Sequence, residues 1–235
     1  MAKKLALTAD KVRKRKMAFL TTKIVILVLF MVMLVAFILL SIVFSVNRFT
    51  ISLDSKLQDE DGIVIYTSMK ERASQRKLYA DTVPNMDNIT YDWIDKEDLI
   101  GNREGSHNGN NYIAYTFYIE NQGKVMVNYW YDILIDDVIR DVDEAIRVVV
   151  RLNDEEIIYA KKNKTTGEAE VGTTSFKSDS VVVSKGRKGF NVGDIDKFTI
   201  VIYLEGEDPD CLNNIIGGEI KMRMDIREEH VDDEK

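Results

Sequence analysis

Hydrophobic and polar residues follow two different patterns along this chain. Residues 24–46 begin with Ile24, end with Val46 and include 23 positions without a charged side chain. From Phe49 onward, apolar and polar residues alternate with the period of two that is typical of β-strands. The pattern therefore predicts one apolar helix followed by a β-rich region.

The clearest predicted strands are residues 112–120, 125–135, 198–204 and 219–226, with shorter ones at 63–66, 89–94, 146–152, 157–161 and 181–183. The turn-forming residues Asn121-Gln-Gly123 predict a hairpin between the first two. Residues 185–189, which include two glycines, predict another turn. Many short strands without strand–helix alternation favour an all-β fold, an antiparallel β-sandwich.

Two short helices interrupt the predicted strands. Asp208 and Pro209 resemble an N-cap and a first helical position, and Gly217 closes the segment, so a helix is expected over residues 209–216. Apolar residues at Val138, Val142 and Ile146 have helical spacing and predict a second short helix or turn.

The apolar run has the length of a membrane span. As a helix it would extend about 35 Å, which exceeds a hydrocarbon core of about 30 Å. We expect an uncleaved anchor. A cleaved leader is the alternative, although apolar regions of leaders are usually shorter and Ser45 ends a poor cleavage site here. Four segments are expected: a basic segment 1–23, the span 24–46, a β-sandwich 47–226 and a charged tail 227–235.

Charge is divided unevenly around the predicted span. Residues 1–23 hold eight Lys and Arg and one Asp, which gives this segment a net charge of +7. Because the whole chain has a net charge of −7, residues 24–235 carry −14. Because cationic flanks stay in the cytoplasm, residues 47–235 are expected outside the plasma membrane. Lys16 and Lys23 are placed to contact anionic headgroups, so the expected partner of this end is the bilayer and not nucleic acid.

Candidate catalytic chemistry is sparse. One Cys excludes an internal disulfide framework, and two His exclude a zinc site made mainly of imidazoles. Cys211 is expected in the core, His107 in a solvated loop, and His230 beyond the last strand. The sequence therefore predicts a protein without a cofactor that is not an enzyme, although paired carboxylates leave a hydrolase open.

Clustered carboxylates suggest a weak calcium site. Hard cations bind such oxygens, and four of the candidates lie close together in sequence: Asp136, Asp137, Asp141 and Asp143. A second acidic group comprises Asp92, Asp95, Glu97 and Asp98. A solvated acidic face is the alternative for both groups, because their spacing matches no calcium loop.

Three consecutive aromatic residues occupy one predicted strand. Trp130 must face opposite to Tyr129 and Tyr131, because successive side chains of a strand alternate. One side is expected in the core. The other is either core as well or an exposed platform for a sugar or a partner chain.

Some stretches resemble a known family. Tyr115-Thr-Phe-Tyr-Ile-Glu-Asn-Gln-Gly123 is similar to the aromatic strand and turn of the TasA/camelysin-like surface proteins of Firmicutes. Gly193-Asp194 before residues 198–204, and Gly217-Gly218 before residues 219–226, look like later strands of that family. The apolar segment is also similarly placed.

The resemblance implies a jelly-roll-like sandwich that assembles into fibres by passing an N-terminal strand to the next subunit. The candidate donor is residues 49–55, with Phe49, Ile51 and Leu53 on its apolar face. Family members normally lose their leader, whereas an uncleaved donor would remain tethered here. The sequence thus predicts a single-pass surface protein with a role in structure or adhesion. Its expected partners are further copies of itself or other envelope proteins. The alternative is a glycan- or calcium-binding module displayed on the surface.

Overall fold

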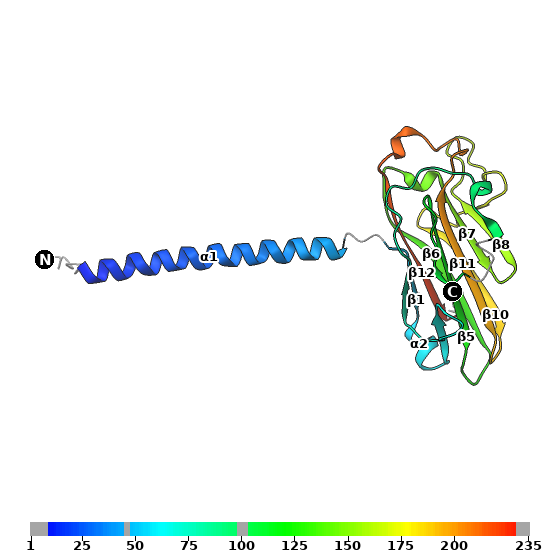
Figure 1. Ribbon diagram of the computed structural model, residues 1–235, viewed down its shortest axis with the longest axis horizontal. Coiled ribbons are helices and arrows are strands. Elements are labelled where there is room, and N and C mark those ends of the chain that lie inside the picture. Colours follow the sequence, from blue (N-terminus) through cyan, green and yellow to red (C-terminus); the bar gives the residue numbers. More distant parts are fainter. Residues whose placement is uncertain (1–8, 45–47, 98–102, 229–235) are drawn as a thin grey trace, which may run out of the picture. The chain divides into compact units, whose positions relative to one another are not determined.

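The computed structural model describes residues 9–44, 48–97 and 103–228 (Figure 1). The chain forms two compact units, residues 1–46 and 47–235. The first contains helix α1 and the second contains the strands.

Helix α1 (Ala9–Phe44) comprises 36 residues, so the predicted apolar helix is confirmed. Within it, the stretch Arg13–Leu39 is long and apolar enough to cross a membrane. The hydroxyls of Thr21 and Thr22 donate to the carbonyls of Met17 and Ala18, at 2.6 and 2.9 Å, which satisfies them inside the helix. Val46, the expected end of the span, lies outside the described residues.

The second unit is built from strands in two sheets. The first sheet has the order β10-β6-β12-β1-β3: β10 (Val181–Phe190), β6 (Val127–Ile139), β12 (Glu219–Glu228), β1 (Thr50–Leu53) and β3 (Lys77–Tyr79). The second sheet has the order β2-β5-β11-β7-β8-β9: β2 (Ile63–Tyr66), β5 (Tyr112–Asn121), β11 (Ile195–Leu204), β7 (Ile146–Leu152), β8 (Glu155–Ala160) and β9 (Thr174–Ser175). Strand β4 (Gly105–Ser106) pairs with β5, and the short helix α2 (Ser55–Asp59) follows β1.

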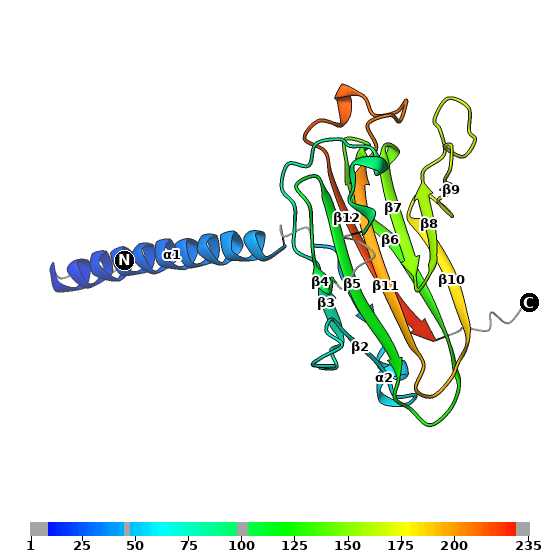
Figure 2. The same ribbon diagram turned by 45° about the vertical axis from the view of Figure 1, so that its right-hand side comes forward.

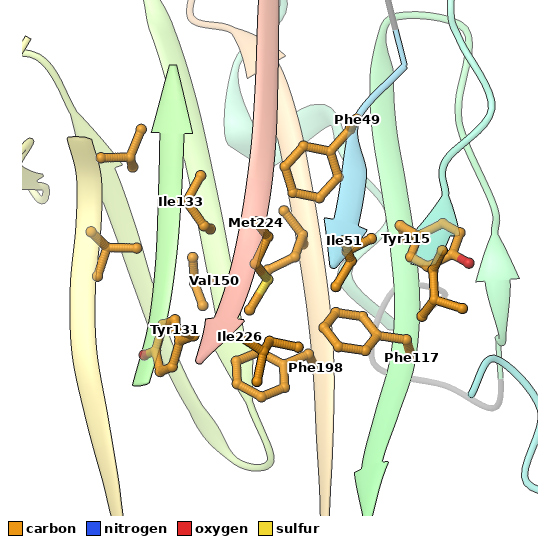
Figure 3. Close-up of a cluster of buried hydrophobic side chains, with 14 of the residues drawn as sticks. Phe49, Ile51, Tyr115, Phe117, Tyr131, Ile133, Val150, Phe198, Met224 and Ile226 are labelled. Atoms are coloured by element: carbon orange, nitrogen blue, oxygen red, sulfur yellow. The ribbon is translucent and has the colours of Figure 1, made fainter. Parts of the chain in front are cut away.

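The two sheets lie face to face (Figure 2). One layer of buried apolar side chains lies between them, which confirms the all-β sandwich. Figure 3 shows its centre, where Phe198 of β11 stacks on Phe117 of β5 with ring centroids 5.3 Å apart. Tyr131 of β6 meets Phe198 edge-on at 5.1 Å. The layer forms because alternate side chains of each strand point inward, as period two requires.

The sheets are mixed and not purely antiparallel. Strand β1 pairs in parallel with β12 and antiparallel with β3, and β8 pairs in parallel with β9. The remaining strand pairs are antiparallel, including the long β5–β11 pair.

The predicted hairpin between residues 112–120 and 125–135 is wrong. Strands β5 and β6 follow each other in the chain but lie in different sheets. Asn121 holds the connection, because its side-chain amide donates to the carbonyls of Val125 and Phe190, both at 2.9 Å. Gly123 lies so close to the backbone of Asp61 that a Cβ would overlap the Asp61 carbonyl oxygen. Asn121 and Gly123 therefore do form a tight connection, but this connection leads from one sheet to the other.

Three other local predictions are also wrong. Residues 185–189 continue strand β10 and form no turn. Of the helix expected over residues 209–216, only the 3₁₀ turn η3 (Asn213–Ile215) is present. By contrast, the short helix or turn expected around Val142 is present as the 3₁₀ turn η2 (Val142–Glu144). Residues 89–94 form a bridge at Ile89 and the 3₁₀ turn η1 (Tyr91–Trp93) in place of a strand.

Replacement of Ile51 tests how much the sandwich depends on β1. Ile51 is fully buried, so Ile51→Ala should lower the free energy of unfolding by about 2–5 kcal/mol through lost burial and a cavity. The measurement is urea unfolding of the full chain, followed by tryptophan fluorescence. Val125→Ala is the control, because Val125 is 58% exposed and should change stability by less than about 0.5 kcal/mol. Equal effects would show that β1 does not stabilise the core.

Candidate functional site

The four calcium candidates do not converge on one point. Asp136 pairs with Arg223 of β12, and Asp137 accepts a hydrogen bond at 3.0 Å from the backbone N–H of Val138. Asp141 has a left-handed backbone, with φ of 51°, and its exposed carboxylate lies 4.0 Å from the Lys164 ammonium. These groups are paired with protein cations or backbone groups.

Asp143 already holds an internal cation. The Lys161 ammonium donates to Asp143 at 2.7 Å and to Glu144 at 2.8 Å, and the Asp143 side chain is only 8% exposed. Burial acts to lower the pKa of Lys161, but the hydrogen bonds that its ammonium donates to both carboxylates raise the pKa overall. The Asp143 carboxylate is thus paired with a cation of its own chain.

A different acidic group forms where two loops meet. One carboxylate oxygen each of Glu170, Asp208 and Asp210 lies within 4.8 Å of the others. Arg147 of β7 contacts the buried Asp208 at 2.6 Å, and the other Asp208 oxygen accepts from the backbone of Asp210 at 2.7 Å. Sequence spacing could not show this group, because Glu170 comes from a loop far from the other two in the chain. Arg147 supplies the balancing charge.

The second acidic group of the sequence stays at the surface. Asp92 pairs with Lys96 at 2.9 Å, and its side chain is 87% exposed. Asp95 and Glu97 are exposed as well, and Asp98 lies outside the described residues. No convergence of these carboxylates is visible among the residues that the structure describes.

His107 differs from expectation because it is buried, with 8% exposure. Its Nδ1 donates to the carbonyl of Gly105 at 3.0 Å, which supports the short strand β4. His230 lies outside the described residues. Cys211 is half-buried, and burial together with the nearby Asp208 and Glu205 raises the pKa of its thiol, so it is a poor nucleophile.

The candidate donor residues lie in their own chain's core. Phe49, Ile51 and Leu53 are 4%, 0% and 6% exposed. Strand β1 sits between β12 and β3, so it fills an interior position of the first sheet (Figure 3).

The aromatic trio divides as alternation requires. Tyr129 and Tyr131 are buried in the core, whereas Trp130 is half-exposed on the outer face of the first sheet. The Tyr129 hydroxyl donates to the buried Asp196 at 2.6 Å, and burial raises the pKa of Tyr129 well above its ordinary value.

A shallow hollow of about 300 Å³ lies on the outer face of the second sheet. It is lined by Arg151, Asn153, Asp154, Lys197 and Thr199, from β7, β11 and the β7–β8 turn. The lining mixes both charge signs, and Arg151 already pairs with Glu156 at 3.5 Å.

Comparisons with known proteins identify no family. No protein-family model matches the chain, and no curated protein matches it. Two crystal structures of a β-glucosidase from Kluyveromyces marxianus are similar over 73% of this chain. The glucose complex has 16% identity and a TM-score of 0.28, and the selenomethionine-labelled form has 14% identity and a TM-score of 0.30. The chain spans only 17–18% of those proteins.

Removal of the Lys161 ammonium should destabilise the domain. Lys161→Met leaves Asp143 and Glu144 without their cation, and the free energy of unfolding should fall by about 1–3 kcal/mol. Because the folded pKa of Lys161 is raised, its contribution is constant through neutral pH and is lost only as alkaline pH passes that pKa. Urea unfolding at several pH values measures both effects.

Lys164→Met is the matched control. Lys164 is 61% exposed and 4.0 Å from Glu144, so its loss should cost less than about 0.5 kcal/mol. If added calcium stabilised the wild-type chain as much as it stabilised Lys161→Met, the ammonium would not be the cation of this site.

Proposed function

We propose that this chain is a membrane-anchored, non-enzymatic surface protein that displays its β-sandwich outside the cell for structure or adhesion. The single observation that carries the proposal is the pairing of one apolar helix with a β-sandwich whose buried acidic groups are paired with its own cations. Such a domain has the properties of a stable displayed module.

The anchor is supported by the composition of α1. Its side chains from residues 13 to 39 are exposed, including large apolar ones such as Phe37 at 71%. In water this surface would be unfavourable, whereas lipid solvates it and the helix satisfies its own backbone. Lys11, Arg13, Lys14, Arg15 and Lys16 near its N-terminal end favour a cytoplasmic N-terminus.

Self-assembly by strand addition is supported by the position of β1. The strand has only four residues and begins the sandwich directly after the anchor segment in the sequence. It joins β3 through three residue pairs and β12 through four. A short N-terminal strand between two others is a segment that neighbouring copies can exchange, because the vacated position offers backbone groups and apolar pockets on both sides.

The orientation can be read by cysteine labelling. In a Cys211→Ser background, Thr165→Cys should react with a membrane-impermeant maleimide on intact cells, because Thr165 is exposed in a loop of the sandwich. Lys3→Cys should react only after the cells are opened. The opposite pattern would contradict the proposed topology. The mass of the labelled Thr165→Cys protein also separates a retained anchor from a cleaved leader.

Strand exchange can be read by cross-linking two variants. Ser52 of β1 lies opposite Asp225 of β12, so chains carrying Ser52→Cys and chains carrying Asp225→Cys should form mixed disulfide dimers only if β1 enters a neighbouring sandwich. Both variants carry Cys211→Ser and are co-reconstituted in lipid before mild oxidation. Non-reducing electrophoresis measures the yield.

The register provides the control for this experiment. Ser55→Cys lies beyond β1 and has no partner in β12 in the observed register, so it should not cross-link to Asp225→Cys. Equal yields for Ser52→Cys and Ser55→Cys would indicate random collision. The absence of mixed dimers in assembled material would exclude exchange while leaving adhesion in place.

A further inference from the structure

We infer that the outer face of the first sheet is a binding platform for a neutral saccharide, centred on Trp130. The inference rests on the proposed adhesive function and specifies a ligand class for it. The platform consists of Trp130 with Asn128, Asp132, Arg223, Asp225 and Arg227, from the neighbouring strands β6 and β12.

Trp130 is held flat against its neighbouring strand. Gly186 of β10 lies directly opposite Trp130, and a Cβ there would come within 3.0 Å of the indole ring. The missing side chain therefore lets the ring rest on the backbone of β10, as aromatic residues do across from strand glycines. The indole is half-buried and held against Gly186, so its accessible part can bind a ligand without a large loss of conformational entropy.

Planar hydrogen-bonding groups surround the ring. Arg227, directly opposite on β12, lies over part of the ring, with its guanidinium carbon 5.8 Å from the ring centroid, and pairs with Asp132. Asp225 accepts from Arg223 at 2.9 Å. Carboxylates and guanidinium groups can bind two adjacent hydroxyls at once. A pyranose offers an apolar C–H face to an aromatic ring and hydroxyls at its rim, which matches this arrangement.

The charge of the platform favours a neutral ligand. Its two arginines are paired with aspartates of the same sheet: Arg227 with Asp132, and Arg223 with Asp225 and Asp136. The rest of residues 47–235 is strongly acidic, with the whole region at −14. The negative charge of the domain would therefore repel an anionic polymer, and the platform has no unpaired arginine to attract it.

The other outer face of the sandwich is covered in part. On the second sheet Ala114, Val149 and Val201 are buried beneath Ile89 and Ile94 of the preceding segment. On the first sheet the outward side chains Trp130, Arg223, Asp225 and Arg227 all remain partly exposed, whereas Asp132 is buried. The fold thus uses its long N-terminal connection to cover part of one face and leaves the ring of Trp130 partly accessible on the other.

Binding of defined oligosaccharides tests the platform. The full chain is reconstituted in lipid nanodiscs, because alkyl-glycoside detergents would themselves present sugars. Neutral chitohexaose, cellohexaose and maltohexaose are compared with an anionic hyaluronan hexasaccharide by calorimetry. The Trp93→Phe variant leaves Trp130 as the sole tryptophan, so its fluorescence reports directly on the platform. At least one neutral hexasaccharide should bind and change this emission, and hyaluronan should bind more weakly.

Two substitutions distinguish stacking from general surface effects. Trp130→Ala should weaken binding by at least about tenfold, whereas Trp130→Phe should retain part of it, because a ring remains. Trp93→Ala is the matched control, because Trp93 is 74% exposed in the turn η1, whose Tyr91 stacks on Tyr203 of the second sheet, and should leave affinity unchanged. Urea unfolding of each variant confirms that the sandwich is intact.

Three results would overturn the inference: no neutral hexasaccharide binding at millimolar concentration, affinity unchanged in Trp130→Ala, or tighter binding of hyaluronan. None of these would affect the labelling and cross-linking results on topology and strand exchange. Conversely, an inverted topology would leave the saccharide measurements in nanodiscs intact while removing the adhesive role.

Discussion

The apolar layer between the two sheets is the constraint on which the rest of this domain depends. It requires every long strand to place alternate side chains inward, and it joins residues as distant in sequence as Phe117 and Phe198. It also explains the position of β1, because Ile51 closes the layer between β12 and β3. A short strand that would be unstable alone is held by burial and by two neighbouring strands.

Buried charges are compensated within the chain. At one edge of the layer, Asp196 accepts from Tyr129, and Arg187 of β10 donates to it at 3.1 Å, which ties both sheets together. Elsewhere Lys161 holds Asp143, and Arg147 holds Asp208. Because isolated buried charges are costly, such pairs are what a stable acidic domain requires. Dense acidic sequence is therefore consistent with internal ion pairs as readily as with a metal site.

The two outer faces of the sandwich connect the fold to the proposed function. The face covered by Ile89 and Ile94 contributes a second small core, whereas the face with Trp130 presents an aromatic ring among paired charges. Under the proposed function, the displayed domain acts through what it can contact. The sheet face around Trp130 is the feature proposed to bind a ligand, and the short strand β1 is the feature proposed to bind a second copy.

The sequence by itself determined the apolar helix, the all-β class and the inward faces of strands such as β5 and β12, because periodicity and hydrophobicity are local properties. Alternation alone also placed Trp130 opposite Tyr129 and Tyr131. Only the tertiary structure decided which strands pair: β5 and β6 separate into two sheets although Asn121 and Gly123 suggested a hairpin. The expected turn at residues 185–189 is strand because this segment pairs with β6, where Gly186 lies opposite Trp130. The partners of Asp143 and Asp208 come from distant segments, and no local pattern can indicate a contact that only the closing of the sandwich creates.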